Sequence, residues 1–399
     1  MVDTLIYLED APLAGDTAAT GLSKALTPML EAITGPTTAI AVCQTHAYIA
    51  ANLHRRFERQ WTAPKLDFQL ARIARKLPAT AGTSAAAWHG ASVARRLQRT
   101  DVLPMAPVRV WVPVGVDPFT LVRARALARA LGSRLSYYLV DDLECHPANQ
   151  LRAAWVRDVV SSCLAEAASV YAITPGLARM LATRYGCSAK VLPLVASASC
   201  AQPTASTGAD RPFAFFLGSA NHLYASGLRD LMALMAELRR DTGQDLTLRL
   251  TCSVSQAKEI LGHVPAWVQT GGATDAEVAH LAGRSSFCFL PYSFDDADRH
   301  MVTTSFPSKL NDYLAYARAI VVYAPRYSVP AELFNSESVP IVVHDVTSLR
   351  QSLSELAAQQ ANFSTDYRRT RDAHFSPSAA LRILREGERV ETNSAHAAS

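Results

Sequence analysis

The segment TTSFPSKLNDYLAYARAIVVYAP, residues 303–325, carries side chains suited to binding an anion. The sequence predicts a helix that opens at Ser305–Pro307, because proline fits the first turn of a helix and Ser305 or Ser308 can cap the unpaired N–H groups there. Lys309 adds positive charge at the same helix end. Free amides, the helix dipole and a lysine together favour phosphate. We therefore expect this helix start to hold the phosphates of a nucleotide.

Asp312 lies four residues after Ser308, so the two side chains share one face of the predicted helix. A carboxylate in that position can accept hydrogen bonds from ribose hydroxyls. The plainer alternative is a capped helix with a solvated Lys309–Asp312 pair. The strand predicted at Ile320–Tyr323 completes an α/β unit, and this flanking pattern favours the nucleotide site.

A second candidate phosphate contact is Gly218-Ser219, directly after the predicted strand Phe213–Leu217. A turn there can bring the backbone close to a donor phosphate, or it can simply lead from a strand into a helix. His222 stands in the same loop and is a further candidate donor contact.

Two carboxylates, Asp141-Asp142, follow the predicted strand Leu135–Val140. One of them can act as a general base or bind acceptor hydroxyls. The pair can also form a metal site, or cap the segment that begins at Pro147. The sequence favours the cap or acceptor-loop interpretation over a metal, so we expect no metal.

The stretch 55–99 carries ten Lys and Arg residues against two acidic residues, with tryptophans interleaved. A basic stripe attracts phosphates, so it predicts docking to an anionic membrane surface or to a lipid-diphosphate acceptor. A solvated helix face is the alternative, and nothing else in the chain supports nucleic-acid binding. His89 lies within the stretch and can meet an acceptor phosphate, although a single histidine is more often structural.

The composition is that of an ordered protein with large cores, since 49 % of its 399 residues are hydrophobic and 19 % are charged. The seven cysteines form no CxxC motif and are odd in number, which predicts reduced thiols in the cytoplasm. We expect no signal peptide in MVDTLIYLEDAP and no membrane-spanning helix. Peripheral attachment to the inner face of a membrane stays open.

Short aliphatic strands alternate with helix-length segments, which predicts parallel sheets covered on both faces. The linker-like stretch 196–211 interrupts this alternation, which then restarts. The predicted fold is therefore two doubly wound Rossmann-like domains facing across a cleft, with ligands at the carboxyl ends of the strands. The predicted organisation comprises an N-terminal domain at 1–195 with a basic, helical insertion at 53–100 that lacks a strand, a linker at 196–211, a C-terminal domain at 212–360, and a helical segment with a flexible tail at 361–399.

The motif around Pro307, Lys309, Asp312 and Tyr313 resembles the donor-binding motif P-x-K-x-x-E-Y-L-A of GT-B glycosyltransferases, in particular the retaining family that includes sucrose and mannosyl transferases. The stretches 171–194, 216–238 and 268–292 are similar to further parts of that family. The resemblance implies that Gly272 lies where the nucleotide base binds. It also implies that the first loop brings Gly15 and Asp16 to the acceptor, with Asp16 as a possible base.

The chain departs from the family pattern at several positions. The family has two glutamates eight positions apart, and here Asp312 stands at the second and Thr304 at the first. The family's Arg and Lys after the first strand of the donor domain are absent. Arg299 or Lys309 can replace those cations.

These observations predict a glycosyltransferase that moves a sugar from a nucleotide-sugar donor to a glycan or lipid-linked acceptor. The helix start with its lysine can stabilise the leaving diphosphate without a divalent metal, so we expect no metal or other cofactor. The resemblance implies that the anomeric configuration is retained. The alternatives are a nucleotide-sugar epimerase of the same fold and a nucleotide-sugar-binding protein without catalysis.

Overall fold

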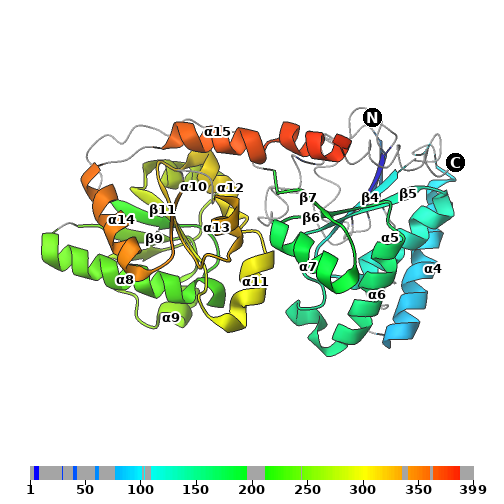
Figure 1. Cartoon of the computed structure of the whole chain (residues 1–399), viewed down its shortest axis with the longest axis horizontal. Coiled ribbons are helices and arrows are strands. Elements are labelled where there is room, and N and C mark those ends of the chain that lie inside the picture. Colours follow the sequence, from blue (N-terminus) through cyan, green and yellow to red (C-terminus); the bar gives the residue numbers. More distant parts are fainter. Residues whose placement is uncertain are drawn as a thin grey trace. The chain divides into compact units, whose positions relative to one another are not determined.

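The computed structural model describes residues 4–8, 29, 39–42, 59–62, 77–100, 103, 109–195, 212–243, 245–334, 340–359 and 363–386. The chain forms two compact units (Figure 1). Unit 1 contains residues 1–195 and 377–399, and unit 2 contains residues 196–376. The segment 361–399 is thus divided between the units at position 377.

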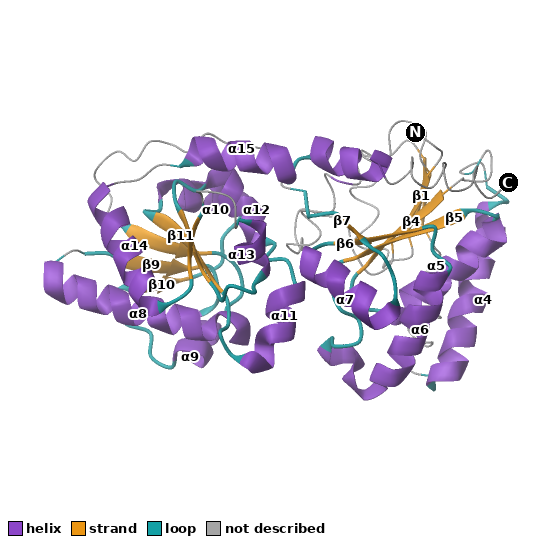
Figure 2. Ribbon diagram, in the orientation of Figure 1, coloured by secondary structure: helices purple, strands orange, loops and turns teal. Residues whose placement is uncertain are grey.

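Unit 1 is built on a parallel sheet of seven strands in the order β3-β2-β1-β4-β5-β6-β7. Figure 2 labels β1, β4, β5, β6 and β7 of this sheet. The strand order reverses between β1 and β4, which is the topological switch point of a doubly wound sheet. The strands are β1 Thr4–Leu8, β2 Ala39–Val42, β3 Arg59–Thr62, β4 Arg109–Val114, β5 Arg134–Leu139, β6 Ser169–Ala172 and β7 Lys190–Val191.

Helices pack beside this sheet, and α5 contacts both α4 and α6. At the first of these interfaces, a side chain at Gly90 of α4 would collide with the backbone of Arg123 in α5. The glycine therefore permits the close approach. The helices are α4 Ala79–Leu97, α5 Pro118–Leu131, α6 Ala153–Ala165 and α7 Pro175–Tyr185, with the short 3-10 helix η2 at Pro147–Arg152. Residues 377–386 are also helical.

The prediction that 53–100 contains no strand is wrong, because Arg59–Thr62 forms β3 and pairs in parallel with β2. The sequence RQWT has a single apolar side chain, so it lacks the hydrophobic run by which a strand is recognised. A short edge strand of this kind is stabilised by pairing with its neighbour in the sheet. The helical part of the prediction is confirmed by α4.

Unit 2 contains a parallel sheet of six strands in the order β10-β9-β8-β11-β12-β13. The order reverses between β8 and β11, so this sheet is also doubly wound. The strands are β8 Phe213–Phe216, β9 Thr247–Leu250, β10 Val268–Thr270, β11 Phe287–Pro291, β12 Ile320–Tyr323 and β13 Ile341–Val343. The helical elements are α8 His222–Thr242, α9 Val254–Leu261, α10 Asp275–Arg284, η3 Asp296–Asp298, α11 Arg299–Thr304, α12 Lys309–Tyr316, α13 Val329–Leu333, α14 Val346–Gln359 and α15 Ser364–His374.

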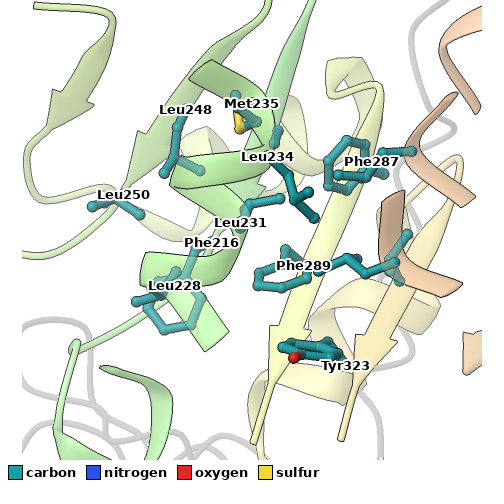
Figure 3. Close-up of a cluster of buried hydrophobic side chains, with 14 of the residues drawn as sticks. Phe216, Leu228, Leu231, Leu234, Met235, Leu248, Leu250, Phe287, Phe289 and Tyr323 are labelled. Carbon is teal, nitrogen blue, oxygen red and sulfur yellow. The ribbon is translucent and has the colours of Figure 1, made fainter. Parts of the chain in front are cut away.

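Two hydrophobic clusters cover the two faces of the sheet in unit 2. Ala214 and Phe216 point into the first cluster, while Phe213 and Phe215 point into the second, as expected from the two-residue period of a strand. Figure 3 shows the first cluster, where leucines of α8 pack on Phe216 and Phe289. The fold thus confirms the prediction of two doubly wound parallel sheets.

Helix starts in unit 2 depend on polar side chains. Asn221 caps α8 by accepting a hydrogen bond from the Leu223 amide, so α8 begins at His222. The loop that carries Gly218-Ser219 is correspondingly short. Among the described residues, no helix is both long enough and apolar enough to cross a bilayer.

Candidate functional site

The helix predicted to open at Ser305–Pro307 begins later in the sequence, because α12 starts at Lys309. Ser308 occupies the N-cap position but makes no side-chain capping hydrogen bond. Ser305 ends the preceding helix α11, and its amide donates to the carbonyl of Met301. Pro307 precedes the helix and accepts a hydrogen bond from the Leu310 amide. The predicted side-chain cap by Ser308 is therefore wrong, and Lys309 is the first residue of α12.

Lys309 enters the molecule instead of extending into solvent, and only 8 % of the residue is exposed. Its Nζ lies 3.5 Å from the centroid of the Tyr224 ring and 4.0 Å from that of Phe216. Among the described residues, this Nζ has no hydrogen-bond partner. Burial holds the pKa of the amine well below its ordinary value, and the nearby Cys252 opposes that effect. A buried amine without an acceptor is rare, because each one costs desolvation energy.

The turn after β8 lies beside Lys309. Gly218 has a φ of 87°, which favours glycine, and a Cβ built on it would lie 3.9 Å from Lys309 Cε. The Gly218 amide donates to Thr251 Oγ1 at 2.6 Å. The preceding amide, that of Leu217, donates to the hydroxyl of Tyr313 at 2.8 Å. Both amides are thus occupied, so Gly218 shapes the turn, while Ser219 beside it is exposed.

Tyr313 ties α12 to two neighbouring strands, β8 and β11. Its hydroxyl accepts from the Leu217 amide and donates to the carbonyl of Phe289 in β11 at 3.2 Å. The ring is fully buried. The side chain therefore fixes the position of α12, and with it Lys309, relative to the carboxyl end of β8.

Asp312, at the second glutamate position of the motif it resembles, is half-buried one turn along α12. Burial is the main reason that the pKa values of Cys288 and Tyr313 are raised, and the charge of Asp312 adds to this effect. Thr304, at the first position, is buried and donates its hydroxyl to the carbonyl of His300. Its side chain is thereby turned back along α11.

Three other predicted donor contacts lie at the surface of unit 2. His222 at the start of α8 is exposed, and its Nε2 lies 3.5 Å from Asp298 Oδ1. Arg299 packs its guanidinium 4.2 Å from the ring centroid of Tyr327 and also pairs with Asp296. Arg299 and Lys309 were the two candidates to replace the Arg and Lys of the family, and Lys309 is the one that lies beside the turn after β8. Gly272 is exposed, and nothing would meet a side chain there.

In unit 1, Asp142 is held in place by a network of ion pairs and hydrogen bonds. Its Oδ2 lies 2.7 Å from Arg184 Nη1, and its Oδ1 accepts from the amide of Glu144. Glu144 in turn binds Arg157 and the hydroxyl of Tyr185. The hydrogen bonds from Arg157 are the main reason that the pKa of Glu144 is lowered.

Asp142 therefore caps the turn after β5 and neutralises an arginine, which are structural tasks. Asp141, the other carboxylate of the pair, is half-buried and remains the candidate for a general base. The residues that surround Asp142 are distant in sequence, and only the fold brings them together.

His89 is 2 % exposed and lies on the buried side of α4 with Gly90 and Val93. The expected contact with an acceptor phosphate is therefore not supported, because that face of α4 contacts α5. Gly15 and Asp16 lie outside the described residues.

Sequence reasoning missed the surroundings of Lys309. Phe216, Tyr224, Thr251 and Cys252 come from three separate segments and share no motif. Tyr313 lay within the recognised motif, but its role as a strand anchor could not be read from spacing. The sequence signal that could have indicated these surroundings was the presence of aromatic residues, Phe216 and Tyr224, on either side of Gly218.

No protein-family model matches the chain, and no curated protein matches its sequence significantly. Solved structures do match. The α,α-trehalose-6-phosphate synthase of Burkholderia multivorans is 12 % identical, with a TM-score of 0.64 over 100 % of this chain and 99 % of that one. HepE of Anabaena, in complex with UDP and glucose, is 12 % identical, with a TM-score of 0.61 over 97 % and 99 % of the two chains. The lipopolysaccharide outer core galactosyltransferase WaaB is 12 % identical, with a TM-score of 0.62 over 97 % and 99 %. The chain therefore has the two-domain α/β fold of the GT-B glycosyltransferases.

Proposed function

We propose that the protein is a glycosyltransferase whose unit 2 binds a nucleotide-sugar donor. The observation that carries this proposal is the buried amine of Lys309, which has no partner among the described residues and lies beside the glycine turn after β8. That turn follows the strand at the topological switch point, where doubly wound sheets bind their ligands. An anion arriving there supplies the acceptor that the amine lacks.

In this proposal the donor diphosphate contacts Lys309 and the exposed Ser219, and the ribose lies near Asp312. Positive charge at the diphosphate stabilises the leaving group as the glycosidic bond breaks. Lys309 can supply this charge without a divalent metal. Retention of the anomeric configuration is part of the proposal and rests on the family resemblance.

The donor test is a thermal-shift screen with UDP-glucose, GDP-mannose and ADP-glucose, each with and without magnesium. UDP-sugars come first because HepE, with the same fold, binds UDP and UDP-glucose. A ligand at about 100 times its Kd stabilises a fold by roughly 2.7 kcal/mol. We expect one of the three to raise Tm by several degrees without metal. Stabilisation that strictly requires magnesium contradicts the metal-free proposal, and no shift with any of them contradicts the donor site.

The acceptor is proposed to be a glycan or a lipid-diphosphate bound by unit 1, with Asp141 as the candidate base. Helix α4 supports a membrane-bound acceptor, because Trp88 and Arg95, seven residues apart on one face of the helix, are exposed, and so is Arg99 in the turn that follows it. Trp88 is 59 % exposed. An exposed tryptophan with arginines suits the headgroup region of an anionic membrane.

The membrane proposal predicts co-sedimentation with phosphatidylglycerol vesicles and none with phosphatidylcholine vesicles. Replacing both Trp88 by Ala and Arg99 by Ser should reduce the bound fraction at least threefold, since an arginine near such a surface contributes about 1 kcal/mol. Arg240→Ser on α8 of unit 2 is the control and should bind like the wild type. Equal binding by the double variant would exclude α4 as the docking face.

A second candidate function is nucleotide-sugar binding without transfer. It is favoured by the buried, hydrogen-bonded Thr304 at the position of the family's first glutamate. Incubation of the stabilising nucleotide-sugar with a mixture of glycan and lipid-diphosphate acceptors separates the candidates. A glycosylated acceptor supports the transferase, interconversion of the free donor indicates an epimerase, and an unchanged donor supports the binding protein.

A further inference from the structure

The environment of Lys309 has a consequence for the charge of its side chain. The amine lies over two aromatic rings and under a backbone turn, and 8 % of the residue remains exposed. A lone ammonium ion in such surroundings loses most of its hydration. Aromatic rings attract a cation and recover part of this loss, but they supply no net negative charge.

The groups that face the amine do not supply a counter-charge. Burial raises the pKa of Tyr224, from α8, to about 12, and it also raises the pKa of the Cys252 thiol after β9. Both are therefore uncharged at neutral pH. Phe216, from β8, does not titrate. On α12 itself, burial also raises the pKa of Tyr313, and Asp312 lies one turn further along.

The charge on Asp312 affects Cys288 and Tyr313, whereas the titratable side chain that affects the pKa of Lys309 is that of Cys252. Cys252 raises the pKa of the lysine but does not cancel the effect of burial, which is the larger one and lowers it. Burial without a counter-charge therefore favours the uncharged amine more than it is favoured in a solvated lysine, as long as no anion is bound.

We propose that Lys309 is neutral in the free protein and takes up one proton when a nucleotide-sugar diphosphate binds, so that donor affinity falls as the pH rises. This inference rests on the proposed donor site. The diphosphate supplies two negative charges within reach of the amine, which favours the ammonium form. The proton comes from the solvent, because both phosphates of a nucleotide-sugar are already ionised near neutral pH.

The test is titration calorimetry with UDP-glucose, or with GDP-mannose or ADP-glucose if one of them gives the larger thermal shift. Measurements at pH 8 use buffers of low and high ionisation enthalpy, and the difference gives the number of protons exchanged. We expect an uptake of about one proton and an affinity that falls by up to tenfold per pH unit where the free lysine is neutral and the bound lysine charged.

Lys309→Arg is the matched variant, because a guanidinium stays charged at every pH of the experiment. It should bind the same nucleotide-sugar with no proton uptake and with an affinity independent of pH. If the substitution does not fold, the pH dependence of donor binding by the wild-type protein still tests whether a proton is taken up.

Binding by the wild type without proton uptake overturns this inference but does not contradict the donor site. Uptake that persists in Lys309→Arg also overturns it, because another group then takes the proton. No binding of any of the three compounds overturns the donor site itself.

Discussion

Lys309→Met is expected to raise the Tm of the protein while weakening donor binding or turnover by about 100-fold or more. The stability gain follows because methionine fills the same space without burying an amine that lacks a partner, a penalty of about 1–3 kcal/mol. The functional loss follows because removal of one group that stabilises developing negative charge typically lowers the rate about 10²–10³-fold. Calorimetric unfolding and donor titration measure the two effects on the same sample.

The gain in stability should depend on pH in a defined direction. The pKa of Lys309 is lowered in the folded protein, whereas an unfolded lysine keeps its proton up to about pH 10.4. Folding therefore releases a proton between the two pKa values, and the wild-type protein becomes more stable as the pH rises through that window. The advantage of Lys309→Met should be largest below the folded pKa and should shrink towards pH 10.

Lys258→Met on α9 is the matched control, since Lys258 is exposed. It should change Tm and donor affinity little. A Lys309→Met protein that melts earlier than the wild type yet binds donor normally would mean that the lysine is a structural group and that the donor lies elsewhere.

Arg123→Met is expected to destabilise unit 1 by about 3–5 kcal/mol, the range for breaking a buried ion pair from one side. Arg123 is fully buried, and its Nη2 lies 2.9 Å from Asp117 Oδ2. Asp117 also caps α5 by accepting a hydrogen bond from the Phe119 amide. The substitution removes the Arg123 cation from beside this buried carboxylate, three residues after β4. Urea denaturation followed by far-UV circular dichroism measures the loss.

Arg125→Met, two residues further along α5, is the control. Arg125 binds Glu166 near the surface, and a pair of that kind contributes about 0–1 kcal/mol. If Arg123→Met is no more harmful than Arg125→Met, the Asp117–Arg123 pair is not the element that holds the start of α5.

The sequence predicted an element well where its hydrophobic pattern and its capping or flanking residues indicate the same bounds. The strand Ile320–Tyr323 has the predicted bounds, because a short aliphatic run between helices forms a buried parallel strand. Local signals also account for the limits of helix α7, since Thr174 and Pro175 start it and Gly186 ends it. Strand β3 was not predicted, because its four residues include one apolar side chain, Trp61, and so show no hydrophobic periodicity.

At the candidate site, too, local sequence identified some features and missed others. Its motif residues, Lys309 and Asp312, were recognised from type and spacing alone. Their expected surroundings were partly wrong, because the helix starts later than Pro307 suggested and the serines do not cap it. The first residue of a helix depends on competition between helical and turn conformations, so the sequence predicts it only to within one or two residues.

By itself, the sequence determined the two doubly wound sheets and the segment that holds the lysine, because strand and helix periods and a contiguous motif are properties of neighbouring residues. Only the tertiary structure decided that Lys309 lies buried between Phe216 and Tyr224 and that Arg184 neutralises Asp142. Burial and charge pairing depend on residues far apart in the chain, and these meet only when the strands and helices pack.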